Sequence, residues 1–294
     1  MGEIHMKFVW DIIWKTLNQF VTFVGTIWVI IDIVANINPG VKDMQKNGWL
    51  IMGGAVCITA IIMIKYIKDY FWHKVKIPET DARICVKIGD ITKGKKGSRV
   101  VGINNKLETS VASIAKNSIH EKIIREHGET IIQEKFAGAK QKLKKVPGRE
   151  ECAFGEAFSC EIHGKHYIFL VMSELHNPTH PTVGKEQLLE AINHFFHNQG
   201  NIDINQNILY FPVIGTGAGG NSMSQKEVIC EIVRQFILFK KGGGGETSRI
   251  RDLNIVVWRK NVHSIDWDNM VKEVDAIVAA CGNCNTVSAL QNRA

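Results

Sequence analysis

The sequence of 294 residues lacks several features that would place it quickly in a class. Its 7 cysteines show no disulfide-framework spacing, which indicates a reducing compartment and excludes a small disulfide-rich secreted protein. No internal repeat or coiled-coil heptad is present, so solenoid and fibrous architectures are excluded. Basic and aromatic residues do not alternate despite the net charge of +7, which argues against a nucleic-acid partner. The lone Cys281-x-x-Cys284 pair has no second pair, and no metal site is expected.

Charge is almost absent from two segments near the start of the chain. Residues 20–37 contain a single charged residue, Asp32, and residues 49–64 contain none. Roughly 20 apolar residues cross a bilayer core, and each segment reaches that length once its flanking turns are included. Soluble helices of this length normally keep a polar face. The sequence therefore predicts a transmembrane hairpin with spans at about 17–37 and 48–68.

Lysines around these segments predict their orientation. The outer flanks carry more of them than the connecting turn, which has Lys42 and Lys46; the flanking lysines are Lys7, Lys15, Lys65, Lys68, Lys74 and Lys76. Positive-inside counting therefore predicts a multi-pass protein of the cell inner membrane with both termini cytoplasmic. The predicted division is a transmembrane region at 1–77 and a cytoplasmic domain at 78–294. The linker 65–78 is expected to continue the second span as a helix. Asp32 either lies solvated at the interface or faces a bundle interior.

The remainder of the chain alternates strand-like and helix-like segments, which predicts an α/β domain. Strands are expected within 84–92 and 99–107, a hairpin at about 154–172, and later strands at 207–214 and 253–258. Helices are expected near 118–126, 129–142, 185–198 and 224–240.

A glycine-rich loop is the clearest single motif. Residues 215–220, Gly-Thr-Gly-Ala-Gly-Gly, follow the apolar run 208–214 and precede an amphipathic segment with Ser222 and Ser224 as candidate N-caps. A strand, a glycine loop and a helix together direct backbone N–H groups and a helix N-terminus at a phosphate. The loop lacks the Gly-Lys-Ser/Thr ending of a Walker A motif, and it lies too late for a dinucleotide fingerprint. The alternative is a tight turn without a ligand.

Polar residues also end two earlier strands. The strand from Ile84 runs into Gly89-Asp90, and the strand from Arg99 ends at Asn104-Asn105. Carboxyl ends of strands are where an α/β sheet places its ligand. In this order, and with the late glycine loop, residues 79–280 resemble the macro domain family. The resemblance implies a three-layer α/β/α domain with a mixed sheet.

The resemblance also implies roles for individual residues. Asp90, with Ile91 beside it, would accept a hydrogen bond from the adenine amino group of a ligand. Asn104, with the adjacent Asn105, would lie near the distal ribose. The diphosphate would be wrapped by the glycine loop and the residue after it: Gly215, Thr216, Gly217, Ala218, Gly219, Gly220 and Asn221. The implied ligand is ADP-ribose or a derivative, with no separate cofactor.

Catalysis is not expected from this chain. Hydrolytic macro domains carry a run of glycines after the Asn strand, whereas residues 107–113 are Leu-Glu-Thr-Ser-Val-Ala-Ser, and Val101 replaces an earlier Asn of the family. Both departures favour a protein that binds ADP-ribose without cleaving it. His176 and His180 either are solvated loop residues or line the distal end of the ligand. Trp258 either packs in the core or faces the adenine.

The combination of a membrane hairpin and a macro domain is similar to the transmembrane macro-domain effectors of type II Thoeris antiphage defence. That resemblance implies a TIR-domain, NAD-consuming partner that makes a signal of the histidine–ADP-ribose type. Binding would rearrange a homo-oligomer in the lipid bilayer and disrupt the membrane. Two alternatives stay open: a membrane-anchored ADP-ribosyl hydrolase, and a membrane-tethered reader of ADP-ribosylated proteins.

Overall fold

The computed structural model divides the chain into two compact units, Met1–Trp72 and His73–Ala294. It describes residues 2–37, 53–54, 56–58, 60–61, 72–94, 96–111, 114–143, 145–148, 150–177, 180–197, 202–214, 223–242 and 249–283. The second unit therefore begins ahead of Pro78, where the sequence placed the junction.

In the first unit, α1 (Gly2–Ile37) is a single long helix. Its window Leu17–Val34 has a mean hydropathy of 1.7 and is long and apolar enough to cross a membrane. The hydroxyls of Thr22 and Thr26 donate to carbonyls one turn earlier, at 2.8 Å each, so these polar groups are satisfied within the helix, as a bilayer requires. Most of the second predicted span, 48–68, lies outside the described residues, and the topology stays a prediction.

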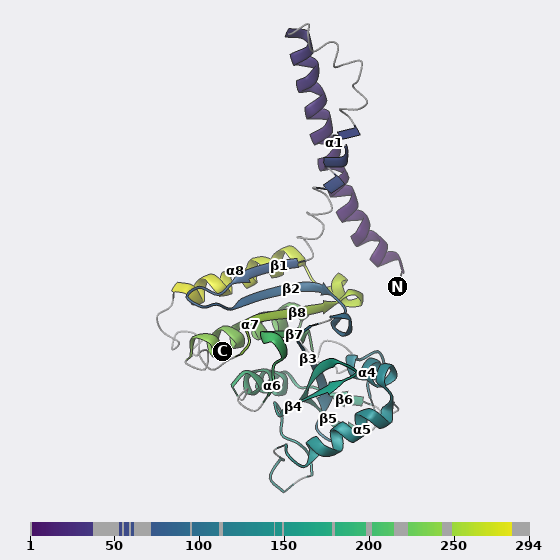
Figure 1. The fold of residues 1–294 in the computed structure, drawn as a ribbon, viewed down its shortest axis with the longest axis vertical. Helices are drawn as coiled ribbons and strands as arrows, with labels where there is room; N and C mark the ends of the chain where they lie inside the picture. The colour runs from purple at the N-terminus through teal and green to yellow at the C-terminus, as the bar shows by residue number, and fades with distance from the viewer. Residues whose placement is uncertain are drawn as a thin grey trace. The chain divides into compact units, whose positions relative to one another are not determined.

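A mixed β-sheet forms the centre of the second unit (Figure 1). Its strand order is β1-β2-β8-β7-β3-β5-β4, with β6 paired to β5. Strands β2, β8, β7, β3 and β5 run parallel, while β4 and β6 run antiparallel to β5. The bounds are β1 Trp72–Lys76, β2 Arg83–Gly89, β3 Ser98–Asn104, β4 Ala157–Ile162, β5 Lys165–Asn177, β6 His180–Thr182, β7 Ile208–Pro212 and β8 Asp252–Trp258.

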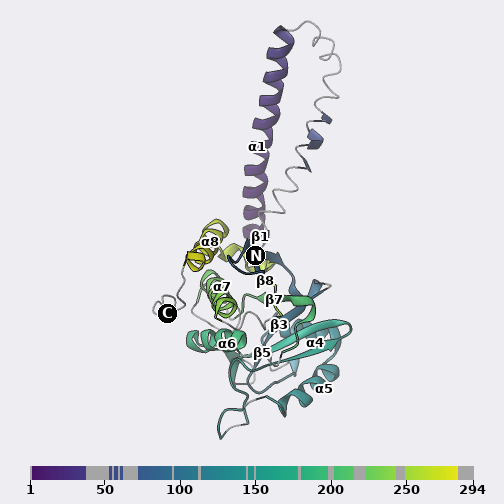
Figure 2. The same cartoon turned by 60° about the vertical axis from the view of Figure 1, so that its left-hand side comes forward.

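Helices cover both faces of this sheet, so the unit has three layers (Figure 2). One face carries α4 and α5, and the other carries α6, α7 and α8. Their bounds are α4 Ile119–His127, α5 Glu129–Lys140, α6 Lys185–His197, α7 Gln225–Lys241 and α8 Trp267–Asn283. Short 3-10 turns are η2 Ile91–Lys93, η5 Asn205–Asn207 and η6 Arg259–Ser264. The predicted three-layer α/β/α domain with a mixed sheet is confirmed.

Local sequence signals set the ends of these helices. The hydroxyl of Ser118 accepts the Glu121 N–H at 3.0 Å and starts α4, and Gly128, at φ 94°, separates α4 from α5. Ser224 and Glu227 form a capping box at the start of α7, which satisfies two backbone donors of the first turn. The predicted N-cap at Ser224 is confirmed, and Ser222 lies outside the described residues.

Aromatic side chains fill the core on each face of the sheet. Under α4 and α5, the rings of Phe136 and Phe169 lie 4.8 Å apart. On the other face, Phe195 of α6 packs edge-on against Phe211 of β7 at 5.4 Å. Burial of each such ring contributes about 1.5–3 kcal/mol. The two cores hold both helical layers on the sheet and so fix the strand ends between them.

Two parts of the unit differ from the sequence-based expectation. The expected helical continuation through 65–78 is wrong over Trp72–Lys76, which form the edge strand β1, with alternating exposed and half-buried side chains. Lysines on a short edge strand hinder pairing with another chain, and the same lysines resemble a membrane flank. The helix α8 beyond residue 258 was not predicted either. Its buried Cys281 belongs to the core, and Cys284 lies outside the described residues.

Candidate ligand-binding site

The parallel strands bring the predicted site residues to one edge of the sheet. Asp90 follows the last residue of β2, and the register pairs Gly89 with Trp258 at the end of β8. On the other side of β7, Asn104 ends β3 and pairs with Ser173 of β5. Asp90, Trp258 and Asn104 thus lie at carboxyl ends of parallel strands, the edge at which open α/β sheets place ligands.

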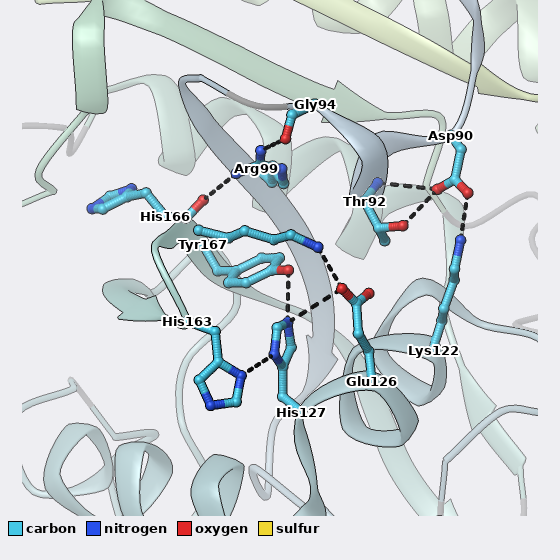
Figure 3. Close-up of polar contacts among 11 residues, drawn as sticks. Asp90, Thr92, Gly94, Arg99, Lys122, Glu126, His127, His163, His166 and Tyr167 are labelled. Atoms are coloured by element: carbon cyan, nitrogen blue, oxygen red, sulfur yellow. Dashed lines mark hydrogen bonds and ion pairs between the residues drawn. The ribbon is translucent and has the colours of Figure 1, made fainter.

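Asp90 is held in a fixed orientation at this edge. Its Oδ1 accepts the backbone N–H of Thr92 at 3.0 Å and the Thr92 hydroxyl at 2.9 Å, which caps η2. Its Oδ2 accepts a hydrogen bond from the ammonium group of Lys122, which reaches up from α4 (Figure 3). Partial burial alone would raise the pKa of Asp90, but the hydrogen bonds from Lys122 and Thr92 outweigh it and lower the pKa. The carboxylate is therefore ionised and oriented at neutral pH.

The sequence alone did not predict Lys122 as a residue of the site. It lies 32 residues from Asp90, on a helix whose sequence marks it only as one polar position among several. The side chain of Lys122 is 39% exposed and that of Asp90 is 19% exposed. The pair therefore lies at the surface of the site edge and not in the core.

The predicted ribose-side residues Asn104 and Asn105 are both 4% exposed. The side-chain oxygen of Asn104 accepts the backbone N–H groups of Lys106 and Glu108, at 3.1 Å each. The side-chain oxygen of Asn105 accepts the N–H of Leu175 at 3.1 Å. These bonds use the carbonyl oxygens of both amides to shape the turn after β3. Contact with a ligand stays a prediction for both residues.

Ile91, the neighbour of Asp90, is 5% exposed within η2. Its side chain therefore anchors the turn that presents Asp90. The role of Ile91 in binding stays a prediction.

The glycine loop itself lies outside the described residues: Gly215, Thr216, Gly217, Ala218, Gly219, Gly220 and Asn221. Both of its ends are described. Before it, the N–H of Val213 donates to Val256 at 3.3 Å and Ile214 is buried. After it, buried Met223 precedes the capped start of α7. The loop thus connects the carboxyl end of a parallel strand to the N-terminus of a long helix, as the phosphate prediction requires.

Other predicted candidates are placed only in part. Trp258 is half-buried. It pairs with Gly89, the residue directly before Asp90. The backbones of His176 and His180 belong to β5 and β6, and their side chains lie outside the description. The choice between a ligand-facing and a structural role stays open for all three.

A polar network lies at the opposite edge, at the amino ends of β3 and β5 (Figure 3). Arg99 is 1% exposed and donates to the carbonyls of Gly94 and His166. His127 lies 3.0 Å from both the Tyr167 hydroxyl and His163 Nδ1. Burial is the largest cause that lowers the pKa of His127. Among the described residues, Arg99 Nε has no hydrogen-bond partner, but the other polar contacts are made within the protein, and we assign the network to the fold.

A serine, a histidine and an aspartate also line up at this edge. The Ser98 hydroxyl lies 2.8 Å from His166 Nδ1, and His166 Nε2 lies 3.9 Å from Asp203. Such residue types form the triad of serine hydrolases. However, Ser98 is 0% exposed and its oxygen accepts the Asn205 N–H at 2.8 Å. A substrate has no access to this serine, so the array ties strands together.

The sheet order, the two helical layers and the polar residues at the parallel strand ends are those expected of a macro domain. The family model described as "Thoeris protein ThsA, Macro domain" matches residues 84–257. The chain belongs to this family. No sequence among the curated proteins matches it.

Solved structures with a similar fold include macrodomains from two organisms. A mutant of the Oceanobacillus iheyensis macrodomain is 17% identical, with coverage of 70% of this chain and 98% of that chain and a TM-score of 0.49. The same macrodomain with ADP is 17% identical, with coverage of 70% and 97% and a TM-score of 0.47. The macrodomain of Mycobacterium tuberculosis DarG is 14% identical, with coverage of 60% and 97% and a TM-score of 0.37.

Proposed function

We propose that the chain is a membrane-anchored effector whose macro domain binds an ADP-ribose derivative as a signal. Binding rearranges a homo-oligomer, and the rearrangement disrupts the bilayer. The chain itself performs no catalysis. A macrodomain of Oceanobacillus iheyensis has been solved with ADPR, and the family of this chain carries the name of the Thoeris system; both are consistent with this ligand class.

One observation carries the ligand proposal. An ionised, oriented carboxylate at Asp90 and the entrance to the glycine loop after Ile214 belong to strands that run parallel in one sheet. A ligand along this edge would meet a base-reading acceptor at one end and a phosphate-binding loop and helix N-terminus further along. ADP-ribose has an adenine and a diphosphate in this order.

The turn after β3 supports binding without cleavage. The oxygen of Asn104 is held by two backbone N–H groups of that turn. Leu107 is buried and has a positive φ of 55°, so the backbone here is packed against the core. In the hydrolytic macro domains that the chain resembles, a run of glycines at this position would place a water molecule at the distal ribose. Residues 107–111 contain no glycine.

The strand β1 supports mechanical coupling between the ligand site and the membrane. It follows the predicted second span in the chain and lies beside β2 in the sheet, and Asp90 directly follows β2. His73 Nε2 also lies 2.8 Å from Asp275 of α8. A ligand can shift the assembly only by binding one of its states better than another. Two spans per chain cannot enclose a pore, so the active form is a homo-oligomer.

The source of the signal is part of the same proposal. A TIR-domain protein that consumes NAD would make it, and the histidine conjugate of ADP-ribose is the preferred form. The two rivals, a hydrolase and a reader of ADP-ribosylated proteins, predict different outcomes in the tests below.

The first test is calorimetry of the full chain in detergent with ADP-ribose, its histidine conjugate and ADP. We expect the histidine conjugate to bind most tightly, with every ligand recovered unchanged. Turnover of an ADP-ribosyl ester that Asn104→Ala abolishes would instead establish the hydrolase. Absence of binding by all three ligands would refute the proposal.

The second test separates the effector from the reader. A flexible Gly/Ser segment is inserted between Tyr70 and Phe71, ahead of β1, and a segment of the same length is inserted after Gly148, an exposed turn residue. We expect both variants to bind ligand, and only the insertion ahead of β1 to reduce ligand-triggered conductance of liposomes. Ligand binding without conductance in the unmodified chain would favour the reader.

A further inference from the structure

The Asp90 carboxylate can accept only a limited number of hydrogen bonds, and those that it accepts within the protein can be counted. An ionised carboxylate has about four acceptor positions, two on each oxygen. Oδ1 accepts two hydrogen bonds from Thr92, and Oδ2 accepts one from Lys122. Oδ2 therefore keeps room for one further donor, and Lys122 does not have to leave before a ligand amino group can bind.

The ammonium group of Lys122 also has hydrogen-bond donors that Asp90 does not use. An ammonium group carries three donors and no acceptor, and one donor points to Asp90 (Figure 3). The side chain is 39% exposed, so a ligand at the strand ends can reach the ammonium group. Asp90 and Lys122 together thus present an acceptor and a donor side by side, at the end of β2.

Adenine has the complementary pattern. Its exocyclic amino group is a donor, and the ring nitrogens on either side, N1 and N7, are acceptors. We propose that Lys122 is a specificity-determining residue that donates to a ring nitrogen of adenine while Asp90 accepts from the amino group. This inference rests on the proposed ADP-ribose site and adds a second base-reading side chain to it, supplied by α4.

The test combines a change in the protein with a change in the ligand. The full chain in detergent is titrated with ADP-ribose and with its 1-deaza and 7-deaza adenine analogues. We expect Lys122→Met to weaken ADP-ribose binding roughly three- to tenfold, the effect of one lost hydrogen bond at a partly exposed site. In the unmodified chain, one deaza analogue should lose a similar factor. In Lys122→Met, that analogue and ADP-ribose should bind equally.

Two control variants separate base reading from general charge. Lys93→Met removes an exposed lysine of η2, close in the chain to Asp90, and should leave the discrimination between ADP-ribose and its deaza analogues intact. Lys122→Arg keeps the charge and the donors and should retain most of the discrimination.

The outcomes are distinct. Stronger binding by Lys122→Met, or unchanged discrimination against both deaza analogues, overturns the role of Lys122 and leaves the proposed function standing. No binding of ADP-ribose by the unmodified chain overturns the proposed function and this inference together.

Discussion

Replacement of the buried His120 should change how the macro domain responds to acid. His120 lies in the first turn of α4 and is 3% exposed. Its ring stacks on Phe136 at 5.6 Å and meets Phe169 edge-on at 6.1 Å. Among the described residues, its Nε2 has no hydrogen-bond partner. Burial lowers the pKa of His120 to about 3, so the native state holds the ring neutral.

The sign and size of the effect follow from linkage. In the unfolded chain the pKa is about 6.5, so below that pH the unfolded chain binds a proton that the native state refuses. Stability is therefore intact above pH 6.5 and is lost as pH falls toward the native pKa of about 3. Between pH 7.5 and pH 5 the loss assigned to this group is about 2 kcal/mol.

The assay is urea unfolding of residues 72–294, followed by tryptophan fluorescence at pH 7.5 and pH 5. We expect the free energy of unfolding of His120→Leu, relative to the unmodified domain, to rise by about 2 kcal/mol between these pH values. His127 and His166 also have lowered pKa values, with burial as the largest cause, and their contributions cancel in the difference. The control is His197→Leu, at an exposed position of α6. A difference for His120→Leu that stays constant with pH would refute the buried, neutral histidine.

Three further substitutions test the site and the fold. Gly217→Glu should abolish ADP-ribose binding in calorimetry while the circular dichroism spectrum stays unchanged, because a carboxylate would repel the diphosphate at the start of α7. Asp90→Ala should weaken ADP-ribose binding by about 1–3 kcal/mol and weaken the hypoxanthine analogue less; equal losses would give Asp90 a purely structural role. Gly97→Ala should lower stability by about 1–3 kcal/mol, since φ is +88° and a Cβ would lie 2.8 Å from the Ile208 carbonyl. Its control, Gly138→Ala in α5, has open space and should raise the thermal midpoint slightly.

The fold of the macro domain was predictable because its signals are local. Short apolar runs mark β3 and β7, and Ser118 and Ser224 cap their helices as their sequence contexts indicate. Some strand ends carry residue types that seldom continue a strand, such as Asp90 after β2 and Asn104 in β3. Such signals act within a few residues, and the structure preserves them.

Contacts between distant segments were not predictable in the same way. The pairing of Lys122 with Asp90 depends on how α4 packs across the sheet, which one sequence does not encode locally. The strand β1 was hidden because its exposed lysines have two physical explanations, a membrane flank and a protected sheet edge. The roles of the glycine loop and of Asn104 stay predictions.

The position of Asn105 has a consequence for how mutations near the site are interpreted. Its N–H donates to Ser173, its backbone carbonyl accepts from Cys152, and its side-chain oxygen accepts from Leu175. One residue thus joins β3, β5 and the segment before β4. Loss of ligand affinity in an Asn105 variant would be ambiguous unless folding were measured in the same sample. Persistence of this asparagine through a lineage would likewise record selection on assembly of the sheet as much as on recognition of a nucleotide.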